Sequence, residues 1–176
     1  MGRGLKKARA SETAQIKGCR ALAVETLLKV ETRKAYADIL LDNELKMTAL
    51  SAQDRGLLTQ LVYGTLRWRG KLDWLLGRII HQPLANMDGY LRNLLRLTVY
   101  QIFFLDKVPA YAAVNEGVEL AKRYGGASAA GLVNAVARRL LREKEHLTKP
   151  DSKADLVQRL SVLWSHPEWL VRKWLA

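Results

Sequence analysis

Residues 90–105, YLRNLLRLTVYQIFFL, form the most apolar stretch of the chain and decide its fold. Apolar side chains recur here at helical spacing and others fill much of the opposite side, which is typical of a helix enclosed by neighbours. The charge-free part, residues 97–105, is too short for a bilayer, which requires about 20 apolar residues. Asp88 is well placed to cap the start of the helix, and Pro109 to stop the chain after it. The stretch therefore predicts the central helix of a bundle.

The composition of the 176-residue chain indicates one domain, or one domain with an appendage. Hydrophobic residues make up 49% of it, which is enough for a substantial core. The net charge of +12 predicts a polyanionic partner, with nucleic acid the first candidate and an anionic membrane the second. A single cysteine, Cys19, excludes an internal disulfide, and no apolar leader precedes it. We therefore expect a cytoplasmic protein.

Helical patterns on both sides of the central stretch predict an all-α fold, a bundle of about seven helices with a short helical linker. Residues 1–10 carry bases and no acid, and are expected to form a basic N-terminal arm. Residues 11–146 hold the apolar stripes of the bundle. Residues 147–176 hold two shorter helical patterns, and the chain stops within the last one. We expect this segment to begin a linker to a missing domain.

Local signals predict where individual helices end and which way they face. Gly70 is expected to separate two helices, and Gly125–Gly126 to end another. Arg92 and Arg96, four residues apart, are expected to mark a polar edge of the central helix. The helix over residues 36–47 is expected to turn a set of apolar side chains inward, namely Tyr36, Ile39, Leu40 and Met47.

Catalytic and metal-binding patterns are absent from the sequence. The three histidines, His81, His146 and His166, are far apart, and there is no HExxH or CxxC spacing. No glycine-rich loop follows a strand pattern, and there is no Walker A motif. No Ser-His-Asp or Cys-His set can be argued. The residues themselves therefore predict that this chain binds a partner, without a metal or cofactor of its own, and catalyses nothing.

Positive charge is concentrated in three segments. Residues 1–20 carry six bases and one acid, and residues 121–150 carry seven bases and two acids. Residues 66–80 carry one acid, Asp73, against four bases, Arg67, Arg69, Lys71 and Arg78. Arginine predominates in the second and third segments, which favours planar, bidentate contact with phosphate. The three segments are expected to converge on one face that binds nucleic acid.

Each part of this basic surface has a plainer interpretation. Trp68 is placed to stack on an unpaired base, or instead to pack against the next helix. Arg67 is placed to contact phosphate, or instead to pair with Asp73. The arginines as a group form a binding surface, or instead a solvated face. The sequence leaves these alternatives open.

Several segments together resemble the NusB-type helical domain. They span residues 16 to 142 and are specific only in combination. They comprise Asp54-Arg55, VYGTLR at 62–67, LDWL at 72–75, residues 97–105 with Tyr100-Gln101, VPAYAAVNE at 108–116, and GLVNAVARR at 131–139. Ala137 stands where that family more often has leucine. The resemblance implies a helical RNA-binding fold.

The tail points to one branch of this family. Residues 164–170, WSHPEWL, resemble the junction that follows the NusB-type domain in the RsmB (Sun) family. Members of that family are S-adenosylmethionine-dependent methyltransferases acting on cytosine C5 of small-subunit (16S) ribosomal RNA. The resemblance implies that the cofactor and the catalytic cysteines belong to the missing methyltransferase domain, and that Cys19 is neither of those cysteines. It is then uncertain whether this chain alone counts as an enzyme, while the full-length parent would.

The expected role of the chain is to hold RNA for that domain. The resemblance implies an RNA-binding basic arm and an adjoining helical surface, which here means Arg3, Lys6, Lys7, Arg9 and Arg20. Charge and helix geometry add four arginines to the candidate RNA-binding residues, namely Arg67, Arg69, Arg138 and Arg142.

Two other functions are compatible with the sequence. One is a stand-alone NusB-like transcription antitermination factor that binds RNA together with a ribosomal protein. The other is a helical scaffold that docks the catalytic domain and touches RNA little. The segment around His166-Pro167 favours the methyltransferase interpretation over the first of these.

Overall fold

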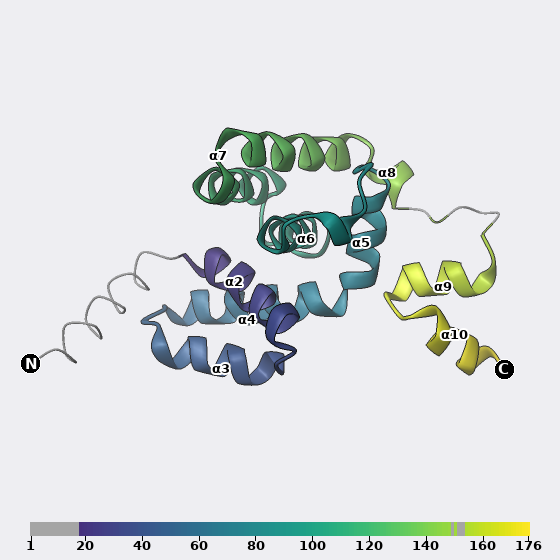
Figure 1. Cartoon of the computed structure of the whole chain (residues 1–176), viewed down its shortest axis with the longest axis horizontal. Coiled ribbons are helices and arrows are strands. Elements are labelled where there is room, and N and C mark those ends of the chain that lie inside the picture. Colours follow the sequence, from purple (N-terminus) through teal and green to yellow (C-terminus); the bar gives the residue numbers. More distant parts are fainter. Residues whose placement is uncertain (1–17, 149, 151–153) are drawn as a thin grey trace, which may run out of the picture. The chain divides into compact units, whose positions relative to one another are not determined.

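The computed structural model describes residues 18–148, 150 and 154–176, and these residues form helices joined by short connections (Figure 1). The described residues contain no β-strand, which confirms the all-α prediction. The chain divides into two compact units, Met1–Tyr63 and Gly64–Ala176, which we describe separately. None of the helices in the described ranges is long and apolar enough to span a membrane.

The first unit is a helical hairpin followed by the start of a third helix. Helix α2 (Cys19–Arg33) packs on α3 (Ala37–Met47), and α4 (Ala52–Arg67) begins in this unit. An ion pair between Lys29 and Glu44 joins α2 to α3. Cys19 is buried, as expected of a small core side chain.

The predicted inward face of α3 is wrong for three of its four residues, while the fourth, Leu40, is half-buried. Tyr36, Ile39 and Met47 are 77%, 57% and 72% exposed. The buried strip instead contains Leu41, and Glu44 on the same side pairs with α2. A short helix with apolar residues on more than one side can be rotated in several ways, and packing against α2 selects one of them.

The second unit is organised around α6 (Gly89–Phe104), as predicted. All side chains from residue 93 to residue 102 are buried, although Arg96 was expected at a polar edge. Asp88 caps the helix by accepting a hydrogen bond from the Leu91 N–H at 3.0 Å. Helix α6 packs against α5 (Arg69–Gly77) and α7 (Ala110–Arg142), and Ile102 clusters with α7 side chains.

Two interruptions of helical conformation occur in this unit. Helix α7 is interrupted at Gly125–Gly126, where Gly126 has a φ of 68°, in line with the predicted break. The break between α4 and α5 lies at Trp68, not at Gly70 as predicted, because Gly70 continues in helical conformation within α5. The remaining elements are η1 (Leu84–Asn86), α8 (Lys144–Leu147), α9 (Leu156–Trp164) and α10 (Glu168–Leu175).

Candidate nucleic-acid interface

Four cations lie along α5 and at the break between α4 and α5. Arg67 is the last residue of α4 and Arg69 is the first of α5, and both are exposed. Lys71 follows in the first turn of α5 and is half-buried, and Arg78 stands just after the last turn. We call Arg67, Arg69, Lys71 and Arg78 the α5 cations. Among the described residues, no hydrogen bond or ion pair engages the side chains of Arg67 and Arg69.

The acid in this segment does not neutralise these cations. The Asp73 carboxylate accepts two hydrogen bonds from the guanidinium of Arg96 on α6. The alternative pairing of Arg67 with Asp73 is therefore wrong. Because Arg96 satisfies Asp73, the local surplus of positive charge along α5 is larger than the sequence count indicates.

Aromatic side chains hold the α4–α5 break in place. The Trp68 ring stacks on Phe104 of α6 with 4.5 Å between ring centroids, so the packing interpretation of Trp68 is the correct one. Phe104 also lies 5.5 Å from the ring of Tyr100. The close approach of α4 to α6 requires Gly64, since a Cβ there would lie 2.0 Å from Tyr100 Cζ.

Lys71 sits on this aromatic platform. Its Nζ lies 5.6 Å from the centroid of the Trp68 ring and 5.9 Å from that of Phe104, within the range of a cation–π interaction. Burial lowers the pKa of the Lys71 ammonium. Burial raises the pKa of the Tyr100 phenol, and the positive charge of Arg67 opposes that shift. Lys71 thus rests on packed aromatic rings.

The arginines of α7 form a second group. Arg138 and Arg142 lie one turn apart and both are exposed, as predicted. Arg142 donates to Glu143 at 3.0 Å and Arg139 donates to Glu143 at 3.2 Å. Hydrogen bonds from Arg142 and then Arg139 lower the pKa of the Glu143 carboxyl. Arg142 is therefore partly engaged, although exposed ion pairs of this kind are weak.

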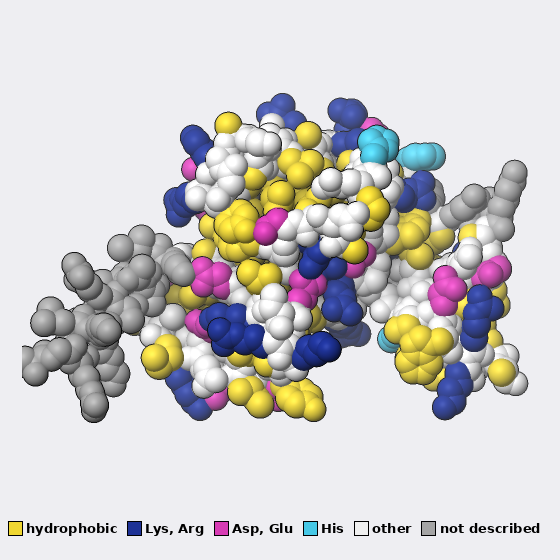
Figure 2. Space-filling model, in the orientation of Figure 1, with side chains coloured by type: hydrophobic (Ala, Val, Ile, Leu, Met, Phe, Trp, Pro, Cys, Tyr) yellow, Lys and Arg dark blue, Asp and Glu magenta, His cyan; other side chains and the backbone are white. Residues whose placement is uncertain are grey.

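The two basic groups belong to the same unit. Figure 2 shows Lys and Arg side chains along the top of the view, over α7. No described hydrogen bond or ion pair links Arg138 or Arg142 to the α5 cations. Arg139 of α7 and residues 79–82, which follow Arg78, line the same depression of about 540 Å³.

Five further residues were predicted to bind RNA. Arg3, Lys6, Lys7 and Arg9 lie outside the described residues. Arg20 lies in the first turn of α2, belongs to the first unit, is half-buried and already takes part in an interaction. Lys71 and Arg78 were not selected from the sequence, although the charge count over residues 66–80 contained the signal.

The described residues contain no cluster of three or more His, Cys, Asp or Glu side chains that could hold a metal ion. At the α4–α5 break the chain presents two exposed guanidinium groups and, on the aromatic platform, the ammonium group of Lys71. Such an arrangement is suited to contacts with phosphate oxygens.

Comparison with known proteins adds sequence and fold evidence. A profile described as the NusB family matches residues 17–142. The chain is 43% identical over 155 residues to a probable ribosomal RNA small subunit methyltransferase B of Bacillus subtilis, a match covering 88% of this chain and 34% of that protein. It is 29% identical over 130 residues to the transcription antitermination protein NusB of Desulforudis audaxviator, covering 72% of this chain and 92% of the other.

A solved structure of a NusB complex contains a chain with the fold described above. In a crystal structure of the antitermination factors NusB and NusE with double-stranded RNA, the matching chain superposes with a TM-score of 0.64 at 22% identity, over 71% of this chain and 94% of that chain. The chain spans about a third of the length of the methyltransferase relative.

Proposed function

Because the chain belongs to the NusB family, we propose that it is an RNA-binding domain that serves a ribosomal RNA methyltransferase. The similarity to a protein described as a small-subunit ribosomal RNA methyltransferase, at 43% identity, supports this role over the other members of the family. The solved NusB complex with double-stranded RNA supports RNA as the partner.

The observation that carries the proposal is the set of α5 cations. Arg67 and Arg69 are exposed. Asp73, the one acid in this segment, is bound by Arg96. Nucleic-acid backbones attract such a surface through counterion release. The arginines of α7 and the basic arm of residues 1–10 extend the proposed contact.

The proposed role is to bind and position substrate RNA for chemistry carried out elsewhere. The substrate would be small-subunit ribosomal RNA and the product a cytosine methylated at C5. S-adenosylmethionine would be bound by a methyltransferase domain outside this chain, and would supply the methyl group there. The proposed ribosomal RNA substrate and the one cysteine of this chain fit the reducing environment of the cytoplasm.

A salt titration tests RNA binding. Anisotropy with a labelled single-stranded RNA is expected to show affinity falling with salt at a slope of roughly −3 to −4, for about four to six phosphate contacts. Replacing Arg67 and Arg69 together by glutamine should make the slope shallower by roughly 1.4, about 0.7 for each phosphate that is no longer neutralised. Arg33→Gln with Lys107→Gln removes two exposed cations outside the three basic segments and serves as the matched control. An unchanged slope in the Arg67/Arg69 variant would remove the α5 cations from the interface.

A stand-alone antitermination factor is the second candidate function. It is favoured by the match to a NusB protein, because this chain covers 92% of that protein's length. A domain exchange separates the two functions. If this chain replaces the matching third of the Bacillus subtilis relative, the methyltransferase interpretation predicts retained methylation of small-subunit ribosomal RNA, and the antitermination interpretation predicts its loss.

A docking scaffold is the third candidate, and the tail helices favour it. Trp169, Trp174 and Leu175 on α10 are 66%, 63% and 51% exposed, and Figure 2 shows hydrophobic side chains on the surface of these helices. Exposed tryptophans of this kind mark contact surfaces. If docking is the main role, Trp174→Ala should reduce methylation by the chimera in which this chain replaces the matching third of the Bacillus subtilis relative. The same substitution should leave the RNA affinity of the isolated chain unchanged.

A further inference from the structure

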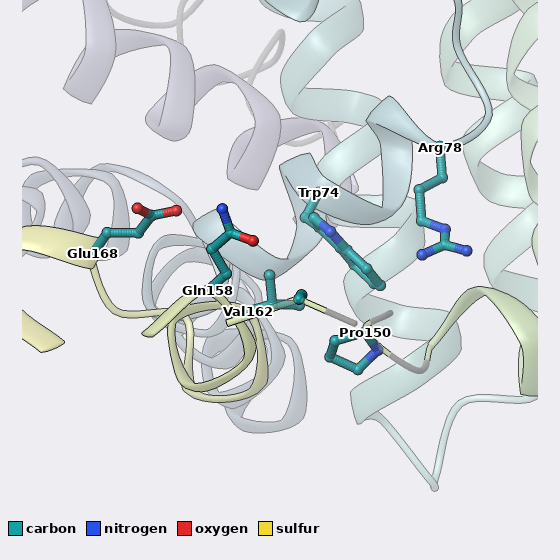
Figure 3. A pocket seen from close by; sticks show the side chains of 7 residues that line it. Trp74, Arg78, Pro150, Gln158, Val162 and Glu168 are labelled. Carbon is teal, nitrogen blue, oxygen red and sulfur yellow. The ribbon is translucent and has the colours of Figure 1, made fainter. Parts of the chain in front are cut away.

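A cleft opens in the second unit beside α5, away from the Trp68 platform. Trp74 and Arg78 line it from α5 and the residue that follows it, Gln158 and Val162 from α9, and Glu168 from the start of α10. Pro150 and Ala154 complete its lining, and its volume is about 400 Å³. Figure 3 shows Trp74 between Arg78 on one side and Gln158 and Val162 on the other. The cleft therefore combines one large aromatic ring with three polar side chains.

The α5 side of the cleft is flat and positively charged. The guanidinium carbon of Arg78 lies 4.8 Å from the centroid of the Trp74 ring, within the range of a cation–π interaction. Both residues are half-buried. Within the described ranges no acid forms an ion pair with Arg78. Unpaired RNA bases stack on such aromatic and guanidinium planes.

The opposite side supplies hydrogen-bonding groups that are largely unused. The Gln158 backbone N–H donates to Asp155, but the Gln158 side-chain amide has no described partner. The Glu168 carboxylate accepts from Arg172 at 3.5 Å, which is a weak contact. An amide offers both donors and acceptors, whereas a carboxylate offers acceptors only. Together these groups suit a planar ligand that has an exocyclic amino group beside ring nitrogens and carbonyls.

We propose that this cleft holds one unpaired nucleobase of the bound RNA, and that it prefers bases with an exocyclic amino group over uracil. The base would lie against Trp74 and Arg78 with its edge toward Gln158 and Glu168, since carboxylates accept hydrogen bonds from the amino group of cytosine. The negative charge of Glu168 disfavours a phosphate here, so the backbone stays outside, toward the other α5 cations. This inference rests on the proposed RNA-binding function and names a subsite for it.

Binding of four single-stranded oligonucleotides of equal length to the full 176-residue chain tests the subsite. They are oligo-A, oligo-C, oligo-U and an abasic ribose-phosphate chain. Oligo-A and oligo-C should bind about tenfold more tightly than the abasic chain. The affinity for oligo-U should lie between that for oligo-C and that for the abasic chain. Equal affinity for all four would overturn the base subsite, while salt-dependent binding of each would leave the proposed RNA-binding function intact.

Two variants place the effect in the cleft. Arg78→Lys keeps the charge but removes the planar guanidinium, and Gln158→Leu removes the amide at an exposed site. Each should lower the affinity for oligo-A and oligo-C severalfold and leave the affinity for the abasic chain unchanged. Arg159→Lys and Gln60→Leu, at exposed positions outside the cleft, are the matched controls and should change neither.

Two further outcomes would count against the inference. If the cleft variants lower the affinity for the abasic chain as much as for oligo-C, Arg78 acts only as a backbone cation and the subsite is wrong. If free cytidine monophosphate binds as tightly as oligo-C, the occupant is a free nucleotide and not RNA. Thermal melts of the variants confirm that each is folded, so that a loss of affinity is assigned to the cleft.

Discussion

Arg96 and Asp73 form a two-point ion pair between the central helix and α5. Arg96 Nε lies 2.6 Å from Asp73 Oδ1, and Arg96 Nη2 lies 2.8 Å from Asp73 Oδ2. The third guanidinium nitrogen, Nη1, donates to Asn93 Oδ1 at 3.2 Å. Arg96 is only 6% exposed, so the cost of burying its charge is offset by this pairing with Asp73. The pair fixes α5 against α6 and also removes the negative charge of Asp73 from the surface that carries the α5 cations.

Replacing Asp73 by alanine should therefore destabilise the second unit. The loss should be about 2–3 kcal/mol, because Arg96 is left buried without its carboxylate, while the one-third exposure of the Asp73 side chain (33%) moderates the cost. Urea unfolding followed by circular dichroism measures it. Asp42→Ala, which breaks the exposed pair with Lys46 on α3, is the control and should cost less than about 0.5 kcal/mol. Equal costs would mean that the Arg96–Asp73 pair is no stronger than a surface pair.

Gly64 should tolerate no side chain. In Gly64→Ala the new Cβ would lie 2.0 Å from Tyr100 Cζ, so the α6 ring must move, at a cost of about 2–3 kcal/mol. A Cβ added at Gly56, in the same helix α4, would meet no neighbouring group within 4 Å. Gly56→Ala should therefore stabilise the chain by about 0.5–1 kcal/mol through helix propensity. Opposite signs for the two variants in thermal melts are the expected result, and equal signs would contradict the close approach of Gly64 to Tyr100.

Ser165 should anchor the tail to α5. Its Oγ accepts a hydrogen bond from the Lys71 N–H at 3.2 Å and so caps the first turn of α5 across 94 positions of sequence. Ser165→Ala should cost about 1 kcal/mol and increase amide exchange at the start of α5. Ser165 has a left-handed φ of 57°, and asparagine tolerates this conformation while keeping an acceptor. Ser165→Asn should thus retain most of the protection, and loss of protection in both variants would indicate a constraint other than the cap.

The basic arm should contribute to RNA affinity without contributing to the fold. Charge reversal at Arg3, Lys6, Lys7 and Arg9 is expected to weaken binding of single-stranded RNA at least about tenfold at low salt, and to leave the unfolding midpoint unchanged. A chain with residues 1–10 in permuted order keeps the charge and should bind as the wild type does. Unchanged affinity after charge reversal, in an anisotropy or filter assay, would exclude the arm from the interface.

The sequence indicated the elements of the fold more reliably than their contacts. The central helix, its cap at Asp88 and the interruption at Gly125–Gly126 follow from local patterns, and each was predicted correctly. The break at Trp68 was placed at Gly70, because a glycine is a visible local signal whereas the stacking of Trp68 on Phe104 is not. The inward face of α3 was wrong for a related reason, since its orientation depends on α2.

The candidate interface was predicted in composition but not in detail. The excess of bases over residues 66–80 was evident from the sequence, yet the availability of each charge was not. Arg142 shares Glu143 with Arg139, whereas Asp73 is taken by Arg96 from another helix. The cleft at Trp74 could not be predicted either, because residues far apart in sequence line it.

The sequence by itself determined an all-helical chain, built around residues 90–105, that carries a large positive charge and belongs to the NusB family. These properties depend on periodicity, caps and composition, which are local or additive. Only the tertiary structure decided which arginines are neutralised, that Trp68 belongs to the packing and that Trp74 lines a cleft. Those outcomes depend on which side chains meet across helices, and distant contacts of that kind leave no periodic pattern in the chain.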